Sequence, residues 1–117
     1  MPITVSRARG INDRKTHTVT GVTHDNELII LVNPTDVVTI TAELTAGPGT
    51  CTILAAAADD GATRTDFTGM VDAGGGAKTA SFASVSIGKG WTAIGVDVGP
   101  TSGGTWTITY RVTPDRA

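Results

Sequence analysis

The chain has 117 residues, of which 39% are hydrophobic and 17% are charged. A chain of this length forms one domain around a single core, and this apolar content argues against intrinsic disorder. The net charge of -2 and the pI near 5.5 argue against a general nucleic-acid binder. Aromatic residues make up only 4%, so aliphatic side chains must build the core.

Threonine and glycine dominate the polar and small residues, with 21 threonines and 15 glycines. Threonine is a β-branched strand former that tolerates the solvent face of a sheet, and glycine supplies tight turns. This composition predicts an all-β protein with many short connections.

The first part of the chain is basic. Four of its cationic residues fall within the first fifteen positions: Arg7, Arg9, Arg14 and Lys15. Against one acid there, Asp13, they give four minus one, a charge of +3, which leaves -5 for residues 16–117. We therefore predict a basic N-terminal arm over residues 1–15, dispensable for folding, and a β-sandwich domain over residues 16–117. Such an arm can serve as an anchor on an acidic partner, but a solvated terminus without a partner is the more common case.

The predicted elements begin with Ile3 and Val5, which suit a short edge strand. A modest strand follows over residues 16–23, where the alternation of apolar residues is interrupted after Val19. Residues 28–32 form a continuous apolar run, which is typical of a strand buried on both faces.

Residues 37–44 alternate cleanly and predict a half-buried strand with Val38, Ile40, Ala42 and Leu44 inward. The Ala-Gly-Pro-Gly turn at 46–49 is expected to close a hairpin onto a strand over residues 50–57. That segment contains four alanines and has some helical propensity, but the turn signals on both sides favour a strand.

The middle of the chain is less regular. A short strand is expected at 63–68, around Phe67, and a long mobile loop at 69–77, which holds three consecutive glycines. In the next strand, over residues 78–87, the apolar face changes sides midway, and a β-bulge near Ala83 and Ser84 is the simplest explanation.

The last two strands are expected over residues 91–98 and 104–113. In the final one, every second side chain is bulky and apolar: Trp106, Ile108, Tyr110 and Val112. Threonines and Arg111 form its other face, and Pro114 ends it because proline has no amide hydrogen for a ladder. About eight strands with regularly spaced turns predict an antiparallel β-sandwich or jelly roll.

Catalytic and metal-binding motifs are not recognisable. Cys51 falls on an inward strand face and is interpreted as a small core residue. His17 and His24 are seven positions apart, on opposite faces of a simple strand, and do not make a zinc site. Asp59 and Asp60 offer oxygens that calcium accepts, but further ligands would have to come from elsewhere, so an Asp-Gly turn is preferred. We predict no catalytic, cofactor-binding or metal-binding residues.

Trp91 is the aromatic residue singled out for ligand or partner contact. It follows a Gly-Lys-Gly turn, and strand alternation would place its side chain on the face opposite to the apolar residues of its own strand. We therefore expect it at an exposed loop tip. Together with Arg7, Arg9, Arg14 and Lys15 it makes up the candidate partner-binding residues.

The small threonine- and glycine-rich β-domain, its basic arm and the lack of a catalytic constellation resemble the β-sandwich accessory proteins of tailed bacteriophage particles, such as capsid decoration proteins and head or tail components. The resemblance is one of overall style over most of the chain and involves no diagnostic motif. It implies a non-enzymatic structural protein that forms a homo-oligomer, with a trimer favoured, and docks on a capsid or tail lattice. The implied location is the virion, after synthesis in the host cytoplasm.

A carbohydrate-binding β-sandwich module is the alternative function, with a glycan as ligand. The first ten residues lack the apolar run of a signal peptide, and the longest apolar run, residues 28–32, is too short to span a membrane. We therefore expect neither a membrane nor a nucleic acid among the partners, and no cofactor.

Overall fold

The computed structural model describes residues 3–7, 16–23, 27–32, 34–56, 67, 70–88, 90–98 and 104–114. Within these residues the chain forms nine β-strands and no helix. The strands are β1 (Ile3–Arg7), β2 (Thr16–Val22), β3 (Glu27–Leu31), β4 (Asp36–Ala46), β5 (Thr52–Ala56), β6 (Val71–Asp72), β7 (Phe82–Ile87), β8 (Ala93–Asp97) and β9 (Thr105–Pro114).

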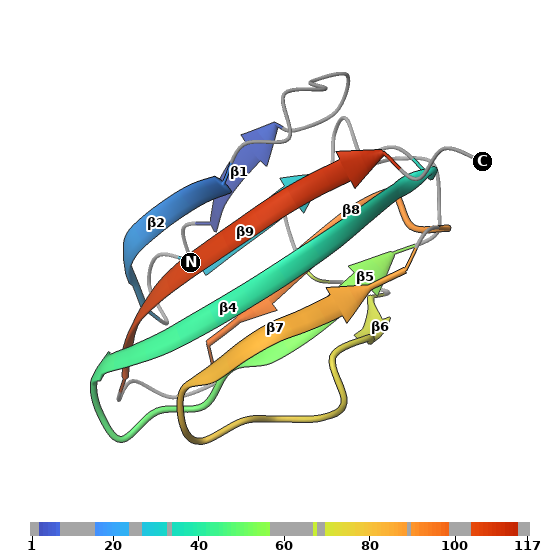
Figure 1. Cartoon of the computed structure of the whole chain (residues 1–117). Coiled ribbons are helices and arrows are strands. Elements are labelled where there is room, and N and C mark those ends of the chain that lie inside the picture. Colours follow the sequence, from blue (N-terminus) through green and yellow to red (C-terminus); the bar gives the residue numbers. More distant parts are fainter. Residues whose placement is uncertain are drawn as a thin grey trace.

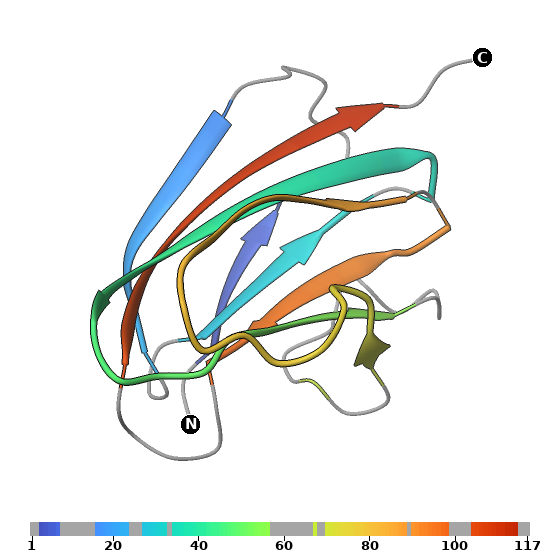
Figure 2. The ribbon, with the colours of Figure 1, turned by 60° about the horizontal axis from the view of Figure 1, so that its bottom comes forward.

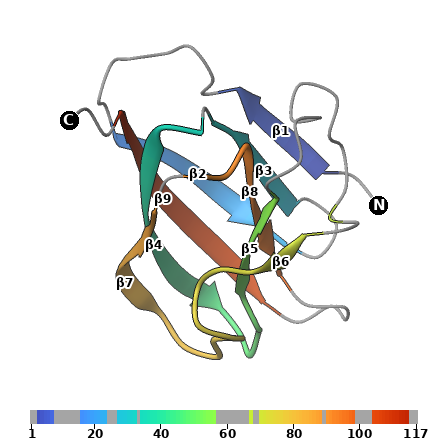
Figure 3. The ribbon, with the colours of Figure 1, turned by 90° about the vertical axis from the view of Figure 1, so that its right-hand side faces the viewer.

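The strands form two sheets packed face to face, as Figures 1 and 3 show from two sides. The five-stranded sheet has the order β1-β3-β8-β5-β6, and the four-stranded sheet has the order β2-β9-β4-β7. All neighbouring strands are antiparallel except β1 and β3, which are parallel. The predicted β-sandwich is confirmed, and the short edge strand at Ile3 and Val5 is present as β1.

The predicted hairpin at residues 46–49 is wrong. β4 pairs with β9 and β7, whereas β5 pairs with β8 and β6, so the turn carries the chain from one sheet to the other. Figure 2 shows this crossing at one end of the sandwich. Gly-Pro-Gly indicates a change of direction, but it does not determine whether the next strand pairs with the previous one or packs across from it. The strand itself is confirmed at Thr52–Ala56.

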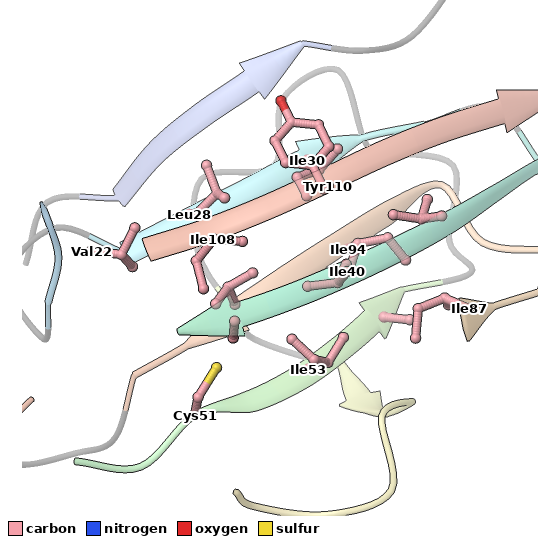
Figure 4. Close-up of a cluster of buried hydrophobic side chains, with 14 of the residues drawn as sticks. Val22, Leu28, Ile30, Ile40, Cys51, Ile53, Ile87, Ile94, Ile108 and Tyr110 are labelled. Carbon is pink, nitrogen blue, oxygen red and sulfur yellow. The ribbon is translucent and has the colours of Figure 1, made fainter. Parts of the chain in front are cut away.

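The main core lies between the two sheets (Figure 4). The inward residues of β4 and β9 alternate as predicted, and Trp106 and Ile108 have no exposed surface. Leu44 is half-buried at the end of this row. The other sheet supplies mainly aliphatic side chains to the same core: Leu28, Ile30, Ile53, Ile94 and Val96.

A second, smaller core lies on the outer side of the five-stranded sheet. All five residues of β3 are buried, which confirms the prediction of a strand buried on both faces. Ile29 and Leu31 point away from the main core and pack with two alanines, and the half-buried Phe67 and Met70 cover them. The chain itself therefore covers the part of this outer face that lies over β3 and its neighbour β8.

Three register shifts interrupt the four-stranded sheet, one of them between Leu44 and Ala46 in the pairing of β4 with β9. The predicted bulge in β7 is confirmed, because the β4–β7 register shifts between the pairs Ile40–Val85 and Ala42–Phe82. Ser84, inside it, has a φ of 57°. The interruption of the apolar alternation in β2 likewise coincides with a register shift against β9, between Val19 and Val22.

The glycine-rich segment is an ordered turn, which corrects the expectation of a long mobile loop at 69–77. It contains β6, which pairs with β5, and Oδ1 of Asp72 accepts hydrogen bonds from the backbone N–H groups of Gly74 (3.0 Å) and Gly76 (3.1 Å). A Cβ built on Gly74 would lie 2.6 Å from Cβ of Ile53, so glycine permits this close approach. The strand expected at 63–68 lies outside the described residues except for Phe67, which is not in a strand.

Candidate functional site

All five aromatic residues are buried or half-buried. Trp106 and Tyr110 are buried, and the other three, Phe67, Phe82 and Trp91, are half-buried. Trp91 packs against the main core, which corrects the expectation of an exposed loop tip. The prediction extended the side-chain alternation of β8 to Trp91, but this residue precedes the strand, where strict alternation does not apply.

The predicted basic arm is described only in part. Arg7 is the last residue of β1, beside Leu31 in the parallel pair, and Leu31 in turn pairs with Ala93. Arg7 and Trp91 therefore come from the same end of the five-stranded sheet. Arg9, Arg14 and Lys15 lie outside the described residues.

The only cysteine is confirmed as a core residue. Cys51 has no exposed surface and is not in a disulfide (Figure 4). Burial, with a smaller contribution from the charge of Asp97, raises the pKa of its thiol from 9.0 to about 12. The thiolate that a nucleophile or metal ligand requires is therefore suppressed at neutral pH.

The described residues contain no group of three or more His, Cys, Asp or Glu side chains suited to a metal ion. His17, on β2, stacks on the ring of Tyr110, with the ring centroids 5.2 Å apart. His24, Asp59 and Asp60 lie outside the described residues.

Asp72 is exposed, and its carboxylate serves the glycine-rich turn. The hydrogen bond from the Gly76 N–H, followed by that from Gly74, lowers the pKa of this carboxyl group below its usual value. Nζ of Lys78 completes the turn by donating to the carbonyl oxygen of Gly75 (3.2 Å). These interactions fix the local backbone, so the turn is structural.

The outer face of the four-stranded sheet is open, whereas Phe67 and Met70 cover the apolar centre of the outer face of the other sheet. Its outward side chains are mainly threonines from β2, β4 and β9, the three strands that lie side by side in Figure 1. Among the described residues of this face, Thr18, Glu43 and Arg111 are exposed, and Thr107 and Thr109 are half-exposed.

The strand register places Arg111 at the centre of a row of hydroxyl groups. On β9 it lies between Thr16 of β2 and Thr39 of β4. The next outward residue of β9, Thr109, likewise lies between Thr18 and Thr41. Neighbouring strands are about 4.8 Å apart, and outward residues of one strand follow each other at about 6.7 Å. We call these six residues the threonine–arginine grid: Thr16, Thr18, Thr39, Thr41, Thr109 and Arg111.

A shallow hollow of about 290 Å³ lies over the grid. Its lining consists of Thr16, Thr39, Thr41, Thr109, Tyr110 and Arg111. Hydroxyl groups and one guanidinium group bind polar or anionic groups by donating hydrogen bonds. The hollow is therefore suited to binding.

Part of this site can be predicted from the sequence. Strand alternation already places Arg111 and the threonines of residues 105–113 on one face. Their neighbours could not be found in this way, because Thr16 and Thr39 reach Arg111 only through the pairing of β2 and β4 with β9. No local pattern specifies that pairing, since the three strands are far apart along the chain.

No helix in the described part of the chain has the length and apolar character needed to cross a membrane. No family model matches this sequence, and a search of curated proteins finds no significant match. Among solved structures, one similar chain is PliG of Aeromonas hydrophila, a periplasmic inhibitor of g-type lysozyme. The match has 12% identity and a TM-score of 0.44, and it covers 96% of this chain and 98% of that one. A likeness of this size supports no conclusion about function.

Proposed function

We propose that this protein is a non-enzymatic binding domain that works as a structural component of a larger protein assembly. The observation that carries the proposal is the difference between the two outer faces. One is covered over its apolar centre by Phe67 and Met70, whereas the other presents the threonine–arginine grid to its surroundings. A broad face of polar but uncharged side chains, with few charges to desolvate, is compatible with burial against another protein.

Two further observations support binding over other roles. The thiol of Cys51 is buried, and the described residues contain no cluster of three or more His, Cys, Asp or Glu side chains suited to a metal ion, so neither a reactive cysteine nor a metal centre competes with a binding role there. Sugar-binding sites commonly stack rings on exposed aromatic side chains, and Trp91 instead packs on the core. The carbohydrate-binding alternative therefore has less support.

The narrower form of the proposal is an accessory protein of a tailed bacteriophage particle, located in the virion. In this role the chain would form a homo-oligomer, with a trimer favoured, and would dock on a capsid or tail lattice. The threonine- and glycine-rich composition and the +3 charge of residues 1–15 support it. The docking arm would carry Arg7, Arg9, Arg14 and Lys15.

The solution mass, measured by light scattering on a sizing column, tests the proposal. The chain weighs 11.9 kDa, and we expect a particle of three chains. Thr107→Lys places a charged side chain on the open face, and Thr79→Lys adds the same charge at an exposed position outside that sheet. If the open face mediates assembly, Thr107→Lys lowers the mass to one chain and Thr79→Lys does not.

A mass of one chain for the unmodified protein at all concentrations would contradict the homo-oligomer. Equal effects of the two substitutions would contradict the role of the open face. A carbohydrate-binding module would instead remain monomeric and change its tryptophan fluorescence in the presence of glycans, which the same samples can show.

A further inference from the structure

We propose that the threonine–arginine grid is a carboxylate-binding site, which takes an Asp or Glu side chain of a protein partner. This inference rests on the proposed function, because it names the chemistry by which the open face would recognise another protein. The strand register puts one guanidinium group at the centre of a row of hydroxyl groups, and a hollow of about 290 Å³ leaves room for a ligand above them.

The hydroxyl groups of the grid are suited to donating hydrogen bonds. Oγ1 of Thr41 already accepts a hydrogen bond of 3.1 Å from the backbone N–H of Ser84. Its own hydrogen is therefore available to an acceptor on a ligand. Arg111 has only donors, and none of the six grid residues carries a carboxylate that would compete for them.

Arg111 is well placed for an external anion. It is exposed, and no acidic side chain of the described residues forms an ion pair with it. The acid on the same face, Glu43, pairs with Thr107, two outward positions along β9 from Arg111. The other cationic side chain that the structure places, Lys78, already donates to the carbonyl oxygen of Gly75.

The charge of the ligand follows from that of the site. One guanidinium group matches one negative charge, and a carboxylate accepts two parallel hydrogen bonds from it. Residues 16–117 carry a charge of -5, which disfavours ligands with many negative charges such as nucleic acids or sulfated polysaccharides. A side-chain carboxylate fits better than an acidic sugar, because no exposed aromatic ring among the described residues is available to stack on a sugar.

The test is an NMR titration of the full chain with small probes, so that it does not require the partner. The probes are N-acetyl-aspartate amide, its neutral analogue N-acetyl-asparagine amide, inorganic phosphate and glucuronate. We expect N-acetyl-aspartate amide to shift the backbone amide signals of Thr39, Thr109 and Arg111, and the neutral analogue to leave them in place. Arg111→Gln should weaken this binding about tenfold or more, because it removes a charge-assisted bidentate contact. Lys78→Gln is the matched control and should leave the affinity unchanged.

Thr39→Val replaces a hydroxyl group by a methyl group of similar size and should weaken the same binding by a smaller factor. The proposal is overturned if no probe causes shifts that depend on Arg111, if the neutral analogue binds equally well, or if Arg111→Gln binds as the unmodified chain does. A preference for phosphate or glucuronate over the aspartate probe also overturns it and assigns the site to that ligand. Aspartate binding by a chain that stays monomeric would support the site and contradict the proposed homo-oligomer. Failure of the carboxylate site and failure of the proposed function therefore give different results.

Discussion

The backbone N–H of Ser84 donates a hydrogen bond of 3.1 Å to Oγ1 of Thr41 on the neighbouring strand. The contact lies in the bulge of β7, where two residues of that strand oppose Thr41 alone. A bulge removes one residue from the regular ladder, and here the side chain of Thr41 satisfies the amide that is set free. Thr41 also lines the hollow over the threonine–arginine grid.

Substitution of Ser84 tests this bulge. Its φ of 57° lies in the left-handed region, which β-branched side chains disfavour most. We expect Ser84→Val to lower the free energy of unfolding by about 1–2 kcal/mol, and Ser84→Gly to lower it by less. Urea unfolding followed by circular dichroism measures both. Ser86→Val, on the same strand and also exposed, is the control. If it destabilises as much as Ser84→Val does, backbone strain at Ser84 is not the cause.

The strands and their buried faces were predicted correctly wherever side-chain alternation determines the structure. β9 buries every second residue from Trp106 to Val112, and β4 does so up to Ala42, as their patterns require. The bulge at Ser84 was predictable for the same reason, because the apolar face changes sides within β7. The complete burial of β3 follows from its continuous apolar run.

Prediction failed where the outcome depends on contacts between distant segments. The turn after β4 is visible in the sequence, but its crossing to the other sheet depends on β9, which pairs with β4 in place of β5. Trp91 was expected to be exposed because its packing on the core cannot be read from its parity. The grid around Arg111 likewise exists only through the order of strands in the sheet.

Gly95 tests the second core on the outer side of the five-stranded sheet. A Cβ at this position would lie 2.9 Å from Sδ of Met70 and 2.9 Å from a ring carbon of Phe67. We expect Gly95→Ala to lower the free energy of unfolding by about 1–3 kcal/mol, because it forces both side chains outward. Gly88→Ala is the matched control, since a Cβ there has no atom within 4 Å. Thermal or urea unfolding compares the two, and similar losses would contradict the close packing at Gly95.

Cys51 makes stability depend on pH in the alkaline range. The pKa of its thiol is raised from 9.0 to about 12 in the folded chain. The stability that the neutral buried thiol contributes is therefore fully present below pH 9 and is lost as the pH rises towards 12. Between these pH values, each pH unit should lower the free energy of unfolding by about 1.4 kcal/mol. Urea unfolding at several pH values measures the slope, and Cys51→Ala gives the slope due to all other groups. Equal slopes would contradict a buried neutral thiol. In the same experiments, a thiol reagent should label Cys51 only after unfolding.

Removal of residues 1–15 separates the two roles suggested for them. β1 pairs with β3 along its full length, from Ile3 with Glu27 to Arg7 with Leu31, so its loss would leave one edge of β3 without its ladder partner. We therefore expect a chain that begins at Thr16 to unfold at a lower temperature, contrary to the expectation from the sequence that this segment is dispensable for folding. The control replaces Arg9, Arg14 and Lys15 by glutamine, which keeps β1 and removes three of the four positive charges. It should retain the melting temperature of the unmodified chain. If the chain beginning at Thr16 melts at the same temperature as the full chain, β1 contributes nothing to stability and the arm is free for docking alone.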